Sequence, residues 1–475
     1  MSPRAPGPAG GVGSLAIVLH SHMPYVEGFG TYPFGEEWLF DAVARSYLPL
    51  LETVERLTMS VTPVLADQLE APGVPERLER FIRRHRLEAA AAEARDVDAP
   101  FRAAVEAEAA RYERGLGLLG ELGGDLLAGF RRAREERGVE LLASAATHAV
   151  LPLLASSACR RLQIDAGLRS HRRRFGAATG FWLPECAYEP GLDALLAERE
   201  VEHFCTDQSA HDEALEALAP VATPAGPTAF TIDWPAVAWL WAFDGYPADP
   251  AYTDFHRTSM RGARPWAIGG EPYDPGAGAA TARRHAGEFA AAAADRLARF
   301  RRERGKPGLL VFAIDTELLG HWWWEGPTWL AEVLKLAPGR GIELLTLSEA
   351  KARHEPERRS LRRSTWGEGK DLRTWDSPRV ADLAWATRRL ELRLLRELGG
   401  RPADERVRRA TRELLAAQAS DWAFLDGRRQ AGDYPYERST AHARAMLEAI
   451  DCPEPPDPRL RNLAPDLSLA PLLEP

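Results

Sequence analysis

Two carboxylates stand directly after apolar segments of the chain. Glu185 follows the run Phe-Trp-Leu-Pro, and Asp315 follows the run Val-Phe-Ala-Ile. Neither carboxylate has a basic neighbour in sequence, so only a partner distant in the chain could make it a structural ion pair. Glycoside hydrolysis needs one carboxyl group that protonates the leaving oxygen and a second that attacks the sugar or activates water. The two residues together therefore predict chemistry on a glycosidic bond.

Two histidines, His20 and His22, follow another apolar run and are separated by one serine. In an extended segment their imidazoles share one face, where they could hydrogen-bond a sugar or ligate a metal ion. With Asp67 nearby in the fold, a metal-dependent polysaccharide deacetylase is an alternative function. Because no third ligand stands at a recognisable spacing, we predict sugar binding at this pair. A metal site and structural burial are the alternatives.

Short apolar runs alternate with longer helical stretches, a pattern typical of a parallel sheet that helices cover on both faces. The expected strands are residues 15–19, 60–65, 139–143, 180–183, 202–206, 309–314 and 342–347. The polar groups that follow these runs are His20 and His22; Asp67 and Gln68; His148; Glu185; Asp207; Asp315, Glu317 and His321; and Ser348 with Glu349. Catalytic groups of a β/α barrel come from the carboxyl ends of several strands. This distribution therefore predicts an α/β barrel with one shared pocket.

The other segments predict helical additions to this barrel. Residues 1–13, rich in Pro, Gly and Ala, are expected to form a disordered lead-in before a catalytic barrel over residues 14–352. Residues from about 70 to 138 are rich in Ala, Glu and Arg with repeated Leu, and they predict a helical insertion. Residues 353–475 predict a C-terminal helical domain. Its expected parts are helices at 380–398, 404–425 and 437–450 and a Pro-rich strap from 453.

Composition narrows the class of protein. The net charge of -9, from 60 basic and 69 acidic residues, argues against nucleic acid as a partner. Four cysteines without CxxC spacing favour reduced thiols and a cytoplasmic location. No stretch reaches the roughly 18 uncharged apolar residues of a membrane span, so we expect no membrane partner. The 14 tryptophans suit a protein that stacks sugar rings, although core packing explains many tryptophans equally well.

Five motifs in fixed order carry a family resemblance. They are residues 20–25 (HSHMPY), 62–69 (TPVLADQL), 181–188 (FWLPECAY), 315–323 (DTELLGHWW) and 364–375, which begins STWGE and ends at Trp375. Residues 418–422 (QASDW) extend the match into the expected helical domain. The set is similar to glycoside hydrolase family 57, and above all to its 1,4-α-glucan branching enzymes. The match runs in order from about residue 14 to residue 440.

The resemblance implies a seven-stranded (β/α)7 barrel, a C-terminal helical domain and a retaining mechanism without metal or organic cofactor. Glu185 falls at the position of the nucleophile and Asp315 at that of the general acid/base. The implied substrate is an α-1,4-glucan such as amylose, glycogen or a maltooligosaccharide. The family's Asp-Ala-Glu-Leu-Phe reads Asp-Thr-Glu-Leu-Leu here, which leaves the carboxylate in place. The implied substrate-binding residues are His20, His22, Asp67, His148, Trp182, His321, Trp322, Trp366, Trp375 and Asp421.

Several activities share such a site, because a glucosyl-enzyme can pass to a 6-hydroxyl, to a 4-hydroxyl or to water. Branching, 4-α-glucan transfer and α-amylase activity are the respective outcomes, and a non-catalytic glucan-binding protein is the alternative of another class. In the branching enzymes a mobile loop after the nucleophile carries a tyrosine that helps to exclude water. Residues 207–223 contain no aromatic residue here, although Tyr246 could substitute from a neighbouring loop. We therefore expect weak branching with a raised share of hydrolysis.

Overall fold

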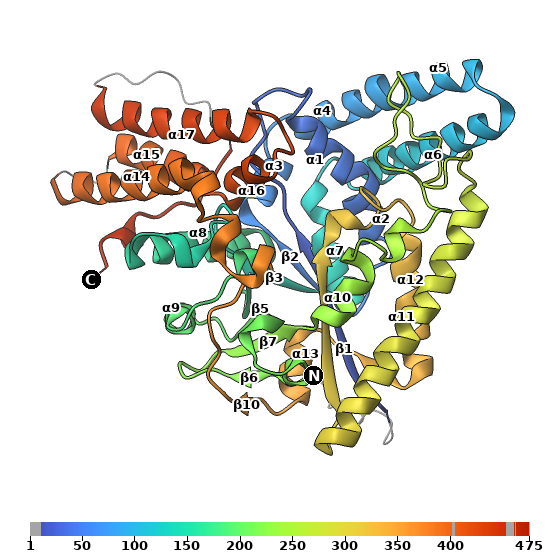
Figure 1. The fold of residues 1–475 in the computed structure, drawn as a ribbon. Coiled ribbons are helices and arrows are strands. Elements are labelled where there is room, and N and C mark those ends of the chain that lie inside the picture. The colour runs from blue at the N-terminus through green and yellow to red at the C-terminus, as the bar shows by residue number, and fades with distance from the viewer. Residues whose placement is uncertain (1–10, 401–403, 453–459, 461, 475) are drawn as a thin grey trace.

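A closed ring of seven parallel strands forms the centre of the molecule (Figure 1). The computed structural model describes residues 11–400, 404–452, 460 and 462–474. The ring order is β1-β2-β3-β4-β5-β7-β8, and a pairing of Ile232 with Val311 joins β7 to β8. The ring strands are β1 (Gly13–Ser21), β2 (Thr58–Val61), β3 (Glu140–Ser144), β4 (Gly180–Trp182), β5 (His203–Asp207), β7 (Thr228–Ile232) and β8 (Gly308–Asp315). The predicted (β/α)7 barrel is confirmed.

The ring strands are apolar because side chains pack against both of their faces. All nine residues of β1 are buried, and so are the first seven of β8. The register of these two neighbours pairs His20 with Asp315 at their carboxyl ends. One histidine and one carboxylate that the sequence separates by nearly 300 positions are thereby side by side.

Helices surround the ring (Figure 1). Those near the barrel are α1 (Glu36–Ala42), α2 (Leu48–Leu51), α3 (Pro63–Leu69), α8 (Ser157–Phe175), α9 (Leu192–Ala197), α10 (Trp234–Trp241), α11 (Pro275–Arg304), α12 (Gly326–Leu336) and α13 (Leu347–Arg353). The segment expected to be a helical insertion is helical, with α4 (Val74–Phe81), α5 (Glu88–Asp96), α6 (Ala99–Glu121) and α7 (Leu126–Arg137). Two further short strands, β6 (Val221–Ala222) and β10 (Glu357–Arg358), pair at the margin of the sheet.

Two of the expected strands differ from the prediction, one in its length and the other in its place in the sheet. The strand expected at 60–65 is β2, which ends at Val61 because Pro63 begins α3. The seventh ring strand is β7, which the sequence reasoning missed, and not the run at 342–347. That run forms β9 (Ile342–Leu344), which pairs only with the first residues of β1 and contributes no strand to the ring.

The polar pair that follows β9 consequently lies away from the other strand-end groups. Ser348 and Glu349 belong to α13, whose first turn is closed by a capping box with Thr346. The Ser348 hydroxyl bonds Glu140 at the start of β3, which is the amino end of that strand. Ser348 and Glu349 are therefore not part of a pocket at the carboxyl ends of the strands.

The C-terminal helices gather on the side of the barrel where α8 lies (Figure 1). They are α14 (Ala381–Gly400), α15 (Glu405–Ala417), α16 (Ser420–Arg428) and α17 (Tyr434–Asp451). The single helix expected over residues 404–425 is wrong, because the chain breaks between α15 and α16. The Ser420 amide donates to the carbonyl of His148, and Ala419 forms an antiparallel bridge with Ala149. These contacts with the barrel occupy backbone groups that a continuous helix would use.

The two ends of the chain lie partly outside the described residues. Strand β1 begins at Gly13, and the Val12 amide donates to Gly341 over 2.9 Å, so the end of the expected lead-in belongs to the fold. Residues 1–10, and residues 453–459, 461 and 475 of the expected Pro-rich strap, are outside the described range. Within the described residues, no helix combines the length and the apolar character that crossing a membrane requires.

Candidate active site

The predicted catalytic residues lie at the carboxyl ends of the ring strands, where a few side chains keep some solvent exposure. Glu185 and Asp315 are partly exposed, as are His22, Trp366 and Asp421. The side chains packed around them are almost all buried. Partly exposed polar groups on a buried floor are what a substrate pocket requires.

Glu185 follows β4 in a short turn whose backbone is unusual. Its φ of 59° and ψ of 19° are left-handed, and the next residue, Cys186, also has a positive φ of 50°. Such conformations are costly for residues other than glycine, and they concentrate at functional sites. The Glu185 carbonyl accepts hydrogen bonds from the Thr365 hydroxyl (2.9 Å) and the Trp366 amide (3.1 Å). The loop around Trp366 thus holds the turn.

Both carboxylate oxygens of Glu185 accept a hydrogen bond from a neutral donor. Trp366 Nε1 donates to Oε2 over 2.8 Å, and the Ser420 hydroxyl donates to Oε1 over 2.8 Å. Burial raises the pKa of Glu185, while these two hydrogen bonds oppose the rise. The two donors therefore favour an ionised and fixed carboxylate.

Asp315 at the end of β8 has a different setting. Burial raises its pKa well above the usual range, and the nearby carboxylates of Glu317 and Glu185 raise it further. Among the described residues, no hydrogen bond to its carboxyl group contributes to this shift of the pKa. One carboxylate stabilised by donors beside another whose protonated form burial favours is the division of roles used in acid and nucleophile catalysis.

Three histidines stack beside the carboxylates. The ring centroids of His22 and His148 are 4.0 Å apart, and those of His20 and His148 are 4.9 Å apart. Burial, followed by the proximity of the other imidazoles, lowers the pKa of His20 and of His148 well below the usual value. His20 and His148 are therefore neutral.

His22 differs because it has a carboxylate partner from the helical region. Its Nε2 lies 3.0 Å from Asp421 Oδ1, near the start of α16. Burial lowers the pKa of His22, but Asp421, Glu317 and Glu185 together raise it above the usual value. The break between α15 and α16 is what delivers this carboxylate to the barrel.

The sequence reasoning missed one site residue, Ser420, and gave another, Glu317, no role in the site. Ser420, beside Asp421 in the QASDW motif, contacts Glu185 directly. Glu317 accepts from the His22 amide over 3.0 Å and from the Tyr47 hydroxyl, and burial raises its pKa to about 7. Glu317 was noted as a group after β8 without a role. For Ser420, the only signal in the sequence was its position next to Asp421, which was a predicted site residue.

Asp67 does not line the pocket, which corrects the expectation for that residue. It lies on α3 and is 1% exposed, in a buried ion pair with Arg174. Its second oxygen accepts from the Ala464 amide over 2.7 Å, and its carbonyl accepts from Asn462. The carboxylate therefore anchors the C-terminal segment to the barrel and has no surface left for a sugar.

Trp182 also differs from the expectation, because the indole is completely buried. It stacks beneath His20 with centroids 4.6 Å apart and meets Trp366 edge-on at 5.2 Å. Trp182 therefore supports residues of the site and is not accessible to substrate.

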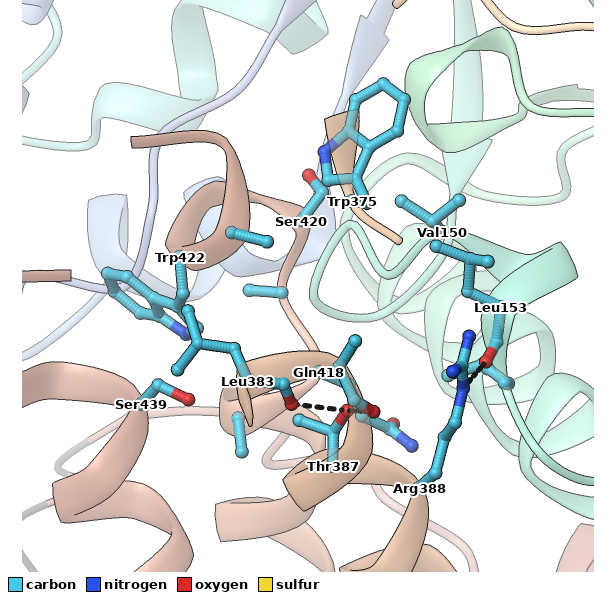
Figure 2. Close-up of a pocket in the computed structure, with 15 residues that line it drawn as sticks. Val150, Leu153, Trp375, Leu383, Thr387, Arg388, Gln418, Ser420, Trp422 and Ser439 are labelled. Carbon is cyan, nitrogen blue, oxygen red and sulfur yellow. Dashed lines mark hydrogen bonds between the residues drawn. The ribbon is translucent and has the colours of Figure 1, made fainter. Parts of the chain in front are cut away.

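Trp375 lies in the wall of a cavity of about 60 Å³ between the barrel and the helical region (Figure 2). Ser420, Trp422, Gln418 and Arg388 line the same cavity. Trp375 is 3% exposed, and its Nε1 has no hydrogen-bond partner among the described residues. The expected contact between Trp375 and substrate is replaced by packing behind Ser420.

His321 and Trp322 lie in the segment that follows β8. Burial, and then the Arg45 guanidinium, lower the pKa of His321 to about 3, so this imidazole is neutral. Its ring meets Phe255 edge-on at 5.5 Å. Trp322 is 41% exposed and lies 6.4 Å from the ring of Trp241, which is 43% exposed. The two indoles form an accessible aromatic surface on segments that follow ring strands.

A metal ion was the alternative for the histidine pair. Among the described residues, no group of three or more His, Cys, Asp or Glu side chains has an arrangement that could hold a metal ion.

Comparison with known proteins agrees with this architecture. Residues 16–229 match the model of glycosyl hydrolase family 57, and residues 386–456 match a model described as the C-terminal region of 1,4-alpha-glucan branching enzyme. A probable 1,4-alpha-glucan branching enzyme of Mycobacterium tuberculosis is 32% identical over 92% of this chain and 91% of its own length. A 1,4-alpha-glucan branching enzyme of Thermococcus kodakarensis is 32% identical over 91% of this chain and 72% of its length.

Solved structures extend the comparison to the fold. The family 57 branching enzyme of Pyrococcus horikoshii superposes with a TM-score of 0.90 at 30% identity, covering 97% of each chain. The alpha-amylase AmyC of Thermotoga maritima superposes with a TM-score of 0.82 at 27% identity, covering 92% of this chain and 93% of its own. With relatives at this identity and coverage, the chain belongs to glycosyl hydrolase family 57.

Proposed function

We propose that this chain is a 1,4-α-glucan branching enzyme that works by double displacement, with Glu185 as nucleophile and Asp315 as general acid/base. The contrast between the two carboxyl groups supports this most strongly. Glu185 accepts two hydrogen bonds that favour its charged form, whereas burial and neighbouring carboxylates raise the pKa of Asp315 and favour its protonated form. The branching enzymes among the relatives support the activity.

In the first step Asp315 protonates the glycosidic oxygen while Glu185 attacks the anomeric carbon. The bond to the leaving chain breaks, and a glucosyl-enzyme ester forms. In the second step the ionised Asp315 removes a proton from the 6-hydroxyl of an acceptor glucan, whose oxygen displaces Glu185. The products are an α-1,6 branch and the regenerated carboxylate. Two inversions at one carbon give net retention.

The aromatic surface of Trp241 and Trp322 supports a glucan as substrate. Sugar rings present apolar C–H faces that stack on indoles, and both indoles are accessible. We assign this surface, together with Trp366 beside the nucleophile, to binding of the glucan chains.

The segment after β5 favours a raised share of hydrolysis. Residues 207–223 form two short turns and β6 without any aromatic side chain. Tyr246 is packed on His285 of α11, with ring centroids 4.5 Å apart, so it does not provide a free aromatic lid. An intermediate that is poorly shielded from water partitions toward hydrolysis. The similarity to an alpha-amylase structure also favours hydrolysis, which is the second candidate function.

Incubation with amylose tests both parts of this proposal. Reducing ends are counted before and after treatment with a debranching enzyme, with Glu185→Gln as the inactive control. We expect a rise before debranching, from hydrolysis, and a further modest rise after it, from α-1,6 branches. No further rise after debranching, whatever the count before it, would refute the assignment as a branching enzyme. Many branches with almost no free reducing ends before debranching would refute the argument from the missing tyrosine.

A further inference from the structure

A continuous chain of hydrogen bonds connects the proposed nucleophile to a serine inside the barrel. We propose that Ser60 and Ser420 are positioning residues for Glu185, joined through His20 and His148 by a chain in which every proton points toward the carboxylate. This inference rests on the proposed role of Glu185 as nucleophile. It assigns functions to a serine on β2 and a serine on α16.

Four short contacts make up the chain. The Ser60 hydroxyl lies 2.6 Å from His20 Nδ1, and His20 Nε2 lies 2.9 Å from His148 Nε2. His148 Nδ1 lies 2.9 Å from the Ser420 hydroxyl, which lies 2.8 Å from Glu185 Oε1. Ser60, His20, His148 and Ser420 are all buried, with Ser60 completely so. Water therefore competes little for these groups.

The proton order follows from the carboxylate at one end. An ionised Glu185 only accepts, so the Ser420 hydroxyl must donate to it and can accept from His148 Nδ1–H. A neutral His148 with a proton on Nδ1 has a bare Nε2, which must accept from His20 Nε2–H. His20 then has a bare Nδ1, which accepts from the Ser60 hydroxyl. The two histidines are consequently opposite tautomers, and both are neutral.

The electrostatic surroundings agree with neutral histidines in the chain. The charged or titratable groups that face Glu185 are His22, His148, Asp315 and Asp421, from segments after β1, β3 and β8 and from α16. His22, paired with Asp421, is the imidazole in this group that its surroundings favour as a cation. Its positive charge disfavours a second proton on His20 or His148.

The first test observes the resting protein and needs no substrate. In protein labelled with ¹⁵N-histidine, two-bond ¹H–¹⁵N correlation spectra at neutral pH report the tautomer of each ring, with His20→Gln and His148→Gln for assignment. We expect the Nε2–H tautomer for His20 and the Nδ1–H tautomer for His148. A cationic ring at either position, or the reversed pair of tautomers, would overturn the proposal. This outcome is independent of whether branching is the activity.

The second test is a double-mutant cycle on the pH dependence of kcat/KM for amylose. Ser420→Ala removes one donor from Glu185, so its pKa should rise. The acidic limb of the pH profile, where kcat/KM falls as the pH falls, should then move to higher pH. Activity on that limb should drop about tenfold. Ser60→Ala should move the limb in the same direction with a loss of about twofold, because polarisation is passed on only in part by each hydrogen bond.

The double-mutant cycle distinguishes an effect of Ser60 that passes along the hydrogen-bond chain to Glu185 from an effect on local packing. In the Ser420→Ala background, Ser60→Ala should produce no further movement of the limb, because the chain to Glu185 is already cut. An equal movement in both backgrounds, or none in either, would overturn the role of Ser60. An unmoved limb in Ser420→Ala, with an unchanged melting temperature, would overturn the role of Ser420.

Two control variants complete the design. Ser420→Thr keeps the hydroxyl and should retain the acidic limb of the unmodified protein. Ser144→Ala deletes a buried hydroxyl on the neighbouring strand β3, whose bond of 2.9 Å goes to the Trp182 carbonyl and not to the chain. It should leave the limb in place. If Ser144→Ala moves the limb as Ser60→Ala does, the effect comes from the barrel core and the proposal fails.

Discussion

Replacing Trp366 by phenylalanine tests how much one neutral donor contributes to the proposed nucleophile. The substitution removes the Nε1–H that donates to Glu185 Oε2 over 2.8 Å, and it keeps an aromatic ring edge-on to Trp182. A hydrogen bond to a charged group contributes about 1.5 to 3 kcal/mol. At about 1.4 kcal/mol for each factor of ten, kcat/KM should fall roughly 10- to 150-fold.

The pH dependence gives the sign of this effect. Burial raises the pKa of Glu185 and the Trp366 hydrogen bond opposes that rise, so its removal should raise the pKa further. Glu185 must be ionised to attack, and activity is lost as the pH falls through its pKa. The acidic limb of kcat/KM should therefore move to higher pH, and the loss should be largest in acid.

Trp375→Phe is the matched control, because it makes the same change in the same loop. Trp375 Nε1 has no partner among the described residues, so only packing is lost there. Initial rates on amylose are measured for both variants across pH, and melting temperatures report folding. A Trp366→Phe enzyme within threefold of the unmodified rate would refute the assigned role of the indole donor. Equal losses in both variants would attribute the effect to packing.

Three further predictions concern the same pocket. Glu185→Gln and Asp315→Asn should each abolish turnover on amylose while glucan binding, measured by calorimetry, persists; near-normal rates in either would exclude that residue as catalytic. Asp421→Asn should lower the pKa of His22, because it removes the carboxylate that stabilises the imidazolium, and an unchanged value in an NMR titration would contradict the pairing. Added chelator should leave amylose activity intact, whereas loss that zinc restores would favour the deacetylase alternative.

Local patterns in the sequence were sufficient to predict the class of fold and to place Glu185 and Asp315 at the carboxyl ends of strands. Continuous apolar runs indicate strands that helices cover on both faces, and polar residues directly after such runs indicate the carboxyl ends that meet in a barrel. Asp315 is the last residue of β8 and Glu185 comes three residues after β4, so their positions needed no knowledge of long-range contacts. Ordered motifs over most of the chain added the family and the expected roles.

The groups around those carboxylates were decided by the tertiary structure. In sequence, Asp67 resembles the other polar residues that follow apolar runs. In the structure it is buried in an ion pair with Arg174, which lies more than 100 positions later in the chain. Strand β7 completes the ring but was missed in the sequence. Its five residues do not differ in composition from other short runs, and only their pairing with the neighbouring strands makes them part of the ring. Such pairings depend on contacts that a local pattern does not contain.

The break between α15 and α16 shows the same limit at the centre of the site. Helical periodicity continues through Gln418 and Ala419, so the sequence predicts one helix there. In the folded protein, backbone groups of His148 and Ala149 form hydrogen bonds with this segment in place of the bonds of a continuous helix. The resulting break brings Ser420 and Asp421 to the barrel. The left-handed backbone of Glu185 is likewise held by bonds from Thr365 and Trp366, about 180 residues away. Sequence periodicity reports local preference, whereas contacts between distant segments supply the free energy that overrides it.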